Sequence, residues 1–267
     1  MKANGLKIVT LITFLIMVMM NGLANALPIN GITTGEVSDS YPNLFAPIGL
    51  TFAIWGVIYL LLALYTGYQM LAFKTSSFSE KSDMFKTVNV WFVVSSIVNS
   101  IWIVAWHYRW IAVTMFLMVI LLVCLIIVNQ FLKNRRLTTG EKILVRLPFS
   151  VYFGWITVAT IANMTTLLVA INWTGWGLTD TVWTNAILLV GVLIGALTII
   201  RNHDVAYGLV FIWAYVGILM KHLSESGFDG AYFSVIVTVV ISLALFIATV
   251  VHILFFKRKE TRNRVSL

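Results

Sequence analysis

The chain of 267 residues contains 60% hydrophobic and only 10% charged residues, carries a formal net charge of +8 and has a mean hydropathy of +0.95. These values lie outside the range of soluble globular domains and exclude water as the main solvent of the chain. The basic residues fall between hydrophobic runs and do not form a basic face on a soluble domain, so the net charge does not indicate nucleic-acid binding.

Eight hydrophobic runs are long enough to cross a bilayer, whose hydrocarbon core of roughly 30 Å needs about 20 helical residues. In chain order we expect transmembrane helices at residues 6–26, 46–71, 87–107, 110–132, 147–171, 181–200, 205–221 and 231–256. The connecting segments, such as the Ser- and Lys-rich segment 72–86, are too short to hold a soluble domain. The predicted fold class is therefore an all-α integral membrane protein with about eight transmembrane helices.

The distribution of Lys and Arg predicts the orientation, because cytoplasmic loops carry an excess of these residues. With eight spans, 16 of the 18 Lys and Arg residues fall on the side of both termini, and the other side receives only Arg109 and Lys221. We therefore expect a multi-pass protein of a bacterial plasma membrane with both termini in the cytoplasm. The first span, which ends in Ala24-Asn25-Ala26, also resembles a cleavable secretory signal, and cleavage would leave the remaining topology unchanged.

No sequence pattern indicates catalysis or metal binding. There is no phosphate-binding glycine loop, no HExxH motif, and no nucleophile and base at recognisable spacing. Cys124 lies within an apolar run and is expected to be a packing residue. His203 and His222 fall at span ends beside charged residues, where we expect solvated side chains and no metal ligation. The sequence thus predicts no enzyme, no catalytic residues, no metal and no required cofactor.

Three spans carry aromatic and amide residues at helical spacing, so that each set lies on one helix face. The sets are Trp55 and Tyr59 in the second span, Asn99 and Trp102 in the third, and Tyr152, Trp155 and Asn163 in the fifth. Counting 1.5 Å per residue from the expected helix ends places Trp55, Asn99 and Asn163 each roughly 14 Å below the same membrane boundary. One interpretation is a shared cavity; the alternative is that the asparagines only hydrogen-bond between packed helices.

Other features predict structure and not a site. Tryptophans near span ends are expected to form an interfacial belt, namely Trp106, Trp110, Trp173, Trp176 and Trp183. Gly191 and Gly195 form a Gly-x-x-x-Gly step, which permits close approach of another helix within the chain, as we favour, or in a homodimer. The basic tail at residues 257–264 is expected to contact anionic lipid headgroups.

In the order and spacing of its motifs the sequence resembles the tryptophan-rich sensory protein (TspO/MBR) family, which includes the mitochondrial translocator protein. The second family helix has a proline-led stretch ending in Trp-x-x-x-Tyr, matched by Pro47, Trp55 and Tyr59. The third has Asn-x-x-Trp, matched by Asn99 and Trp102. The fifth has Tyr-x-x-Trp-x-x-x-Ala-x-x-x-Asn, matched by Tyr152, Trp155, Ala159 and Asn163.

The resemblance covers roughly residues 1–174 and implies a five-helix membrane bundle there, followed by an additional three-helix segment, residues 175–267, with a basic cytoplasmic tail. The chain departs from the family pattern at four positions. It has Gly49 in place of a tryptophan, Phe52 in place of a proline, Ser95 in place of a glutamine and Val151 in place of a proline. The sterol pattern at the end of the fifth family helix is absent, so the resemblance does not imply sterol binding here.

The function implied by the resemblance is binding of a planar hydrophobic ligand, such as a porphyrin or haem-like tetrapyrrole, linked to sensing, regulation or transport. The implied ligand-binding residues are Trp55, Tyr59, Asn99, Trp102, Tyr152, Trp155 and Asn163. Expected partners are membrane lipids and this hydrophobic small molecule. The alternatives are a small-solute or lipid-like transporter and, less favoured, a membrane enzyme that modifies a tetrapyrrole.

Overall fold

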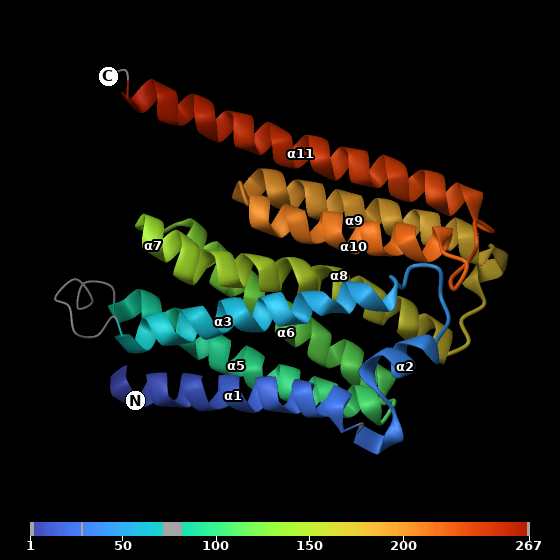
Figure 1. The fold of residues 1–267 in the computed structure, drawn as a ribbon, viewed down its shortest axis with the longest axis horizontal. Helices are drawn as coiled ribbons and strands as arrows, with labels where there is room; N and C mark the ends of the chain where they lie inside the picture. Colours follow the sequence, from blue (N-terminus) through green and yellow to red (C-terminus); the bar gives the residue numbers. More distant parts are fainter. Residues whose placement is uncertain (1–2, 28, 72–81, 266–267) are drawn as a thin grey trace. The chain divides into compact units, whose positions relative to one another are not determined.

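The computed structural model describes residues 3–27, 29–71 and 82–265, and in these residues it contains helices and no strand (Figure 1). Eight stretches are long and apolar enough to cross a membrane, which confirms the predicted all-α membrane fold. They are Gly5–Ala26, Gly49–Leu71, Ser82–His107, Ile111–Lys133, Thr139–Ala170, Asp180–Asn202, Val205–Leu223 and Phe233–Phe255. Most of the segment 72–86 and the side chains of the basic tail fall outside the described residues.

Eight long helices form these spans: α1 (Ala3–Ala26), α3 (Ile54–Leu71), α5 (Ser82–His107), α6 (Ile111–Lys133), α8 (Leu147–Ala170), α9 (Asp180–Asn202), α10 (Val205–Leu223) and α11 (Phe233–Val265). A 3-10 turn, η2 (Gly49–Ala53), leads into α3. The fifth span begins at Thr139 and not at residue 147, because a short helix, α7 (Thr139–Glu141), and a π-helical turn, η4 (Lys142–Arg146), precede α8. The capping box of Thr138 and Glu141 sets this earlier start.

The chain divides into two compact units, one comprising Met1–Pro42 and Ile54–Ile171 and the other comprising Asn43–Ala53 and Asn172–Leu267. The main boundary, after Ile171, falls close to the division expected after residue 174. The segment Asn43–Ala53, however, groups with the C-terminal unit and not with the first bundle. Its backbone explains this difference, since the amide of Ile48 donates to the carbonyl oxygen of Gly217 in α10 over 3.1 Å.

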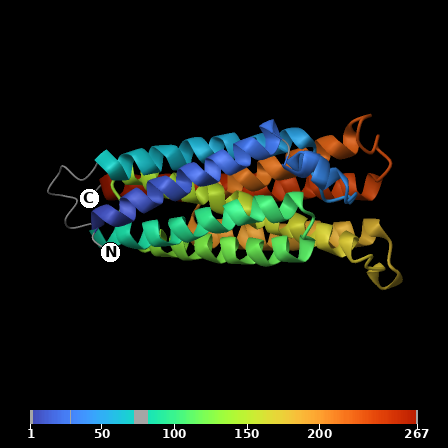
Figure 2. The ribbon, with the colours of Figure 1, turned by 90° about the horizontal axis from the view of Figure 1, so that it is seen from below.

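In the first unit α1 packs against α5, α5 against α6 (Figure 2), and α8 against both α6 and α3. Its centre contains Tyr65 of α3, Phe92 of α5 and Phe149 of α8, whose rings meet edge to face with centroids 4.9 to 5.7 Å apart. All three side chains are fully buried. Edge-to-face contacts are a favoured geometry for aromatic pairs, so this core fixes α3, α5 and α8 against one another.

The second unit packs α9, α10 and α11 together. The backbone of Gly195 in α9 lies against two phenylalanine rings: a Cβ there would be 2.6 Å from Cε1 of Phe246 and 2.9 Å from Cδ1 of Phe211. Glycine at this position therefore permits close packing within the chain, as the favoured interpretation of the Gly-x-x-x-Gly step predicts.

His222 is not solvated, contrary to the prediction from its position at a span end. Its side chain is fully buried, Nε2 lies 2.9 Å from the carbonyl oxygen of Leu44, and its ring packs on Phe228 with centroids 4.8 Å apart. The prediction is wrong because the segment Asn43–Ala53 covers this end of α10, and a contact between residues so far apart in sequence leaves no local signal. His203, by contrast, is exposed.

Candidate functional site

Four of the predicted site residues meet between α3 and α8, and we call Trp55, Tyr59, Tyr152 and Trp155 the aromatic cluster. Trp55 stacks on Tyr59 with ring centroids 5.4 Å apart. The Trp55 indole also contacts Tyr152 and Trp155 edge-on, with centroids 6.0 and 6.3 Å apart. Each helix contributes two residues spaced three or four apart, which places each pair on one face. The two residues of α8 are buried and the two of α3 are half-buried.

A chain of buried hydrogen bonds joins this cluster to α1 and α5. The amide nitrogen of Asn99 donates to the hydroxyl oxygen of Tyr152 over 3.3 Å, and Oδ1 of Asn99 accepts from Nδ2 of Asn21 over 2.7 Å. Nδ2 of Asn21 also donates to the carbonyl oxygen of Met17 over 2.9 Å. Asn21 was not among the predicted residues. The feature of the sequence that could have found it is an amide side chain within the apolar run of the first span.

Two predicted site residues bury polar atoms that have no hydrogen-bond partner among the described residues. These atoms are the hydroxyl oxygen of Tyr59 and the indole nitrogen of Trp102. A buried polar atom without a partner costs about 1–3 kcal/mol relative to its solvated state. A ligand with polar atoms at its edge would remove this cost by pairing with them.

Trp102 belongs to a different set of contacts from the aromatic cluster. It stacks on Trp106 with ring centroids 5.5 Å apart, and both pack with Val37 of α2 (Thr34–Asp39). Trp106 is only 5% exposed and donates from its indole nitrogen to the carbonyl oxygen of Thr34 over 3.1 Å. The prediction that Trp106 belongs to the interfacial belt is therefore wrong, because α2 covers this end of α5.

Asn163 is also separated from the aromatic cluster. Its Oδ1 accepts a hydrogen bond from the hydroxyl of Thr114, near the start of α6, over 3.1 Å. Asn163 lies eight residues beyond Trp155 along α8, or about 12 Å of helix. The common depth predicted for Trp55, Asn99 and Asn163 is therefore wrong for Asn163. The ligand contacts expected of Trp102 and Asn163 remain predictions.

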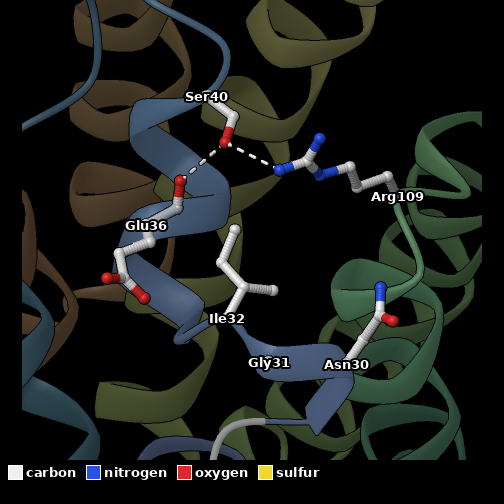
Figure 3. A pocket seen from close by; sticks show the side chains of 6 residues that line it. All are labelled: Asn30, Gly31, Ile32, Glu36, Ser40 and Arg109. Atoms are coloured by element: carbon white, nitrogen blue, oxygen red, sulfur yellow. Dashed lines mark hydrogen bonds between the residues drawn. The ribbon is translucent and has the colours of Figure 1, made fainter.

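A polar pocket of about 520 Å³ lies in the same unit, where η1 (Ile29–Gly31) and α2 approach the turn between α5 and α6. We call it the Arg109 pocket; its lining consists of Asn30, Gly31, Ile32, Glu36, Ser40 and Arg109 (Figure 3). Nδ2 of Asn30 donates to the carbonyl oxygen of His107 over 3.2 Å, which ties η1 to the end of α5. The sequence did not predict this pocket, because its two sides lie about 70 residues apart in the chain. The only indication was that Arg109 is one of two basic residues on the side of the predicted topology that has few Lys and Arg residues.

Glu36 forms a capping box at the start of α2. Its Oε2 accepts from the backbone amide of Thr33 over 2.7 Å and from the Thr33 hydroxyl over 2.8 Å. These hydrogen bonds, the backbone one foremost, lower the pKa of the Glu36 carboxyl. The carboxylate is therefore charged at neutral pH, and Thr33, not Arg109, binds it.

Metal binding finds no support in the part of the chain that the structure describes, where no group of three or more His, Cys, Asp and Glu side chains could hold an ion. In comparisons with known proteins, a family model described as TSPO-like protein matches residues 7–255. This match extends well beyond residue 174, where the motif resemblance ended, and includes the three C-terminal spans. No curated protein and no solved structure matches the chain.

Proposed function

Because the chain belongs to the TSPO-like family of membrane-embedded binding, sensory or transport proteins, we propose that it binds a planar hydrophobic ligand such as a porphyrin or haem-like tetrapyrrole. The proposed site is the aromatic cluster together with Asn99. The chain is an integral multi-pass membrane protein, so a hydrophobic ligand dissolved in the lipid phase can reach its surface. We further propose a bacterial plasma membrane and cytoplasmic termini, on the distribution of Lys and Arg.

The observation that carries this proposal is the meeting of four aromatic rings with a buried amide inside one helical unit. Trp55 and Tyr59 stack with only 22° between their ring planes, and both side chains are half-buried. Each ring of this stacked pair partly covers one face of the other, and both side chains remain partly exposed, so part of their aromatic surface can contact a ligand. A conjugated macrocycle stacks favourably on such a surface and buries a large apolar area there.

Two tyrosine hydroxyls suit the polar edge of such a ligand. The Tyr59 hydroxyl is buried without a hydrogen-bond partner among the described residues. The Tyr152 oxygen accepts from Asn99, which leaves its own hydrogen for donation to a ligand. Specific ligand sites commonly combine an apolar lining with a few such oriented polar groups.

A titration of the purified full-length chain in lipid nanodiscs with protoporphyrin tests the proposal. Binding is followed by the porphyrin absorbance band, because removing a tryptophan does not alter this reporter. Trp55→Leu should weaken a saturable affinity about tenfold, since a stacked aromatic contact is lost. Trp110→Leu is the matched control, because that indole is 57% exposed at the start of α6. An unchanged affinity in a folded Trp55→Leu variant would overturn the site.

We propose binding and not catalysis, in line with a family whose members are generally non-enzymatic. The absorbance spectrum of bound protoporphyrin should stay constant in light and in darkness. Progressive loss of the pigment spectrum, absent from the Trp55→Leu variant, would instead support the tetrapyrrole-modifying enzyme.

Transport is the second candidate, and a row of buried polar residues on α5 favours it. Asn89, Ser96 and Asn99 follow at spacings of seven and three, which places them on one helix face, and all three are buried. The Ser96 hydroxyl has no hydrogen-bond partner within the described part of the chain. Porphyrin flux into proteoliposomes separates the two functions, because a carrier moves the ligand across the bilayer whereas a receptor shows saturable binding without flux.

A further inference from the structure

Arg109 occupies a backbone conformation that normally favours glycine. Its φ of 57° is left-handed, and the amides around it close the end of α5: that of Arg109 donates to Trp106 over 3.0 Å and that of Trp110 to Ala105 over 2.9 Å. Helices commonly end in this way with glycine at the left-handed position. An arginine here departs from the residue that local conformation favours, and its guanidinium extends toward α2 (Figure 3).

Most of the hydrogen-bonding capacity of the guanidinium is available to a ligand. The group has five N–H donors, and its hydrogen bond within the described residues is to the hydroxyl oxygen of Ser40, over a long 3.4 Å. The Ser40 hydroxyl in turn donates to the carbonyl oxygen of Glu36 over 2.8 Å. Asn30 uses one amide hydrogen on His107 and retains the other. Donors from η1 and from the α5–α6 turn thus line one pocket.

The nearest acidic residue of the pocket does not neutralise Arg109. The Glu36 carboxylate is bound by Thr33 and lies on the opposite side of α2 from the guanidinium (Figure 3). The side-chain hydrogen bond of Arg109 goes to Ser40, and the hydrogen bonds of the Glu36 carboxylate go to Thr33. The pocket therefore presents a positive charge with unused donors and the apolar side chain of Ile32.

We propose that Arg109, with Asn30 and Ser40, forms a carboxylate-binding subsite at this end of the first unit. A guanidinium can bind both oxygens of a carboxylate through two parallel N–H donors, which gives the pair both strength and a defined geometry. The carboxylate belongs either to a small free acid or to an amphipathic ring compound, and only the second source rests on the proposed function. Arg109 lies two residues after the end of α5, and therefore at the end of a membrane span. A carboxylate of a hydrophobic ligand that binds there is not buried in the hydrocarbon core, where a charge is costly.

The test compares protoporphyrin, which carries two carboxylates, with its dimethyl ester, which carries none, on the full-length chain in nanodiscs. A second arm measures the Tm in sodium propionate against sodium chloride of equal ionic strength. If the ring compound is the source, wild type should bind the free acid about tenfold more tightly than the ester, and Arg109→Gln should remove this preference by weakening the free acid alone. If a small acid is the source, acid and ester should bind alike, and propionate should raise the Tm of wild type but not of Arg109→Gln.

Two variants control for folding and for charge. Arg109→Gly suits the left-handed backbone, so it should keep or raise the Tm while losing the carboxylate effect as Arg109→Gln does. Lys221 is the other basic residue that the predicted topology places on the same side of the membrane as Arg109. Lys221→Gln should leave both the acid-to-ester ratio and the response of the Tm to propionate unchanged. The subsite is overturned if wild type and Arg109→Gln show the same acid-to-ester ratio and the same response to propionate. If neither porphyrin binds, the proposed function fails, and the propionate arm alone decides the subsite.

Discussion

The indole nitrogen of Trp213 donates a hydrogen bond to the carbonyl oxygen of Thr51 over 2.9 Å. Thr51 lies in η2, directly before α3, and the neighbouring backbone bond from Ile48 to Gly217 fastens the same segment. A helix of the C-terminal unit thus holds the residues that lead into Trp55. Changes in α10 are expected to reach the aromatic cluster along the chain itself.

Gly217→Ala should loosen this attachment. A Cβ at Gly217 would overlap the side chain of Thr51, whose Cβ and Cγ2 would both lie 2.9 Å away. We expect the free energy of unfolding to fall by about 1–3 kcal/mol, as in other overpacked sites, with a lower Tm of the purified protein. Thr51→Ala removes two of the crowding atoms, so the double variant should recover part of the loss.

Gly67→Ala is the matched control for this pair of variants. Nothing lies within 4 Å of a Cβ at Gly67 in α3, and alanine is the better helix former, so its Tm should stay or rise. Strictly additive losses in the Gly217→Ala and Thr51→Ala double variant would contradict the proposed contact.

Gly195→Ala tests whether the glycine step packs within the chain. The added methyl group would crowd Phe246 and Phe211, and we expect a loss of about 1–3 kcal/mol in the free energy of unfolding. Phe246→Leu in the same chain should restore part of the Tm. An unchanged Tm together with a shift from dimer to monomer in size-exclusion chromatography would assign the glycine to a homodimer instead.

Asn99→Leu and Asn163→Leu distinguish the aromatic cluster from the outer amide. Asn163→Leu removes one buried interhelical hydrogen bond and Asn99→Leu removes two, so stability should fall by about 0.6 kcal/mol per bond, the average for such bonds in membranes. Only Asn99→Leu should weaken porphyrin binding, because Asn99 alone orients the Tyr152 hydroxyl. An equal loss of affinity in Asn163→Leu would show that both asparagines belong to one site.

Acid should loosen α2 by protonating Glu36. Hydrogen bonds from Thr33 lower the pKa of the Glu36 carboxyl below its ordinary value of 4.5. The unfolded chain therefore takes up the proton more readily, so this stabilisation is complete above pH 4.5 and is lost as pH falls through the lowered pKa. Hydrogen-exchange protection of the α2 amides should decrease in that window, after correction for intrinsic exchange rates. Glu36→Gln should abolish the pH dependence, and an equal decrease in that variant would refute the assignment.

The sequence predicted the features that depend on local periodicity. Eight apolar runs gave the eight spans, since span length is set by bilayer thickness. The spacing of four between Trp55 and Tyr59 in α3, and of three between Tyr152 and Trp155 in α8, predicted the two helix faces that meet where Trp55 contacts Tyr152. The common depth of Trp55 and Asn163 was predicted wrongly because residues 46–53, which lead to Trp55, were counted as α-helix. The chain there includes the 3-10 turn η2 and non-helical backbone, which rise more per residue and place Trp55 deeper.

Contacts between distant residues escaped prediction. The bond between Trp213 and Thr51 and the burial of His222 by Leu44 join positions more than 160 residues apart and leave no periodic pattern. The Arg109 pocket likewise depends on how a 3-10 turn and a six-residue helix fold over a helix end. In the sequence, residues 27–45 stand out only by their Pro and Gly residues, which interrupt helices.

The early segment Asn43–Ala53 belongs to the late unit, and this interleaving bears on how the polypeptide is made. A ribosome that has delivered residues up to Ile171 to the membrane has already produced α3, yet the backbone of Ile48 and Thr51 still lacks its partners. Those partners emerge only with α10, about 45 residues later. The entrance to α3 is therefore among the last parts of the protein to mature during synthesis.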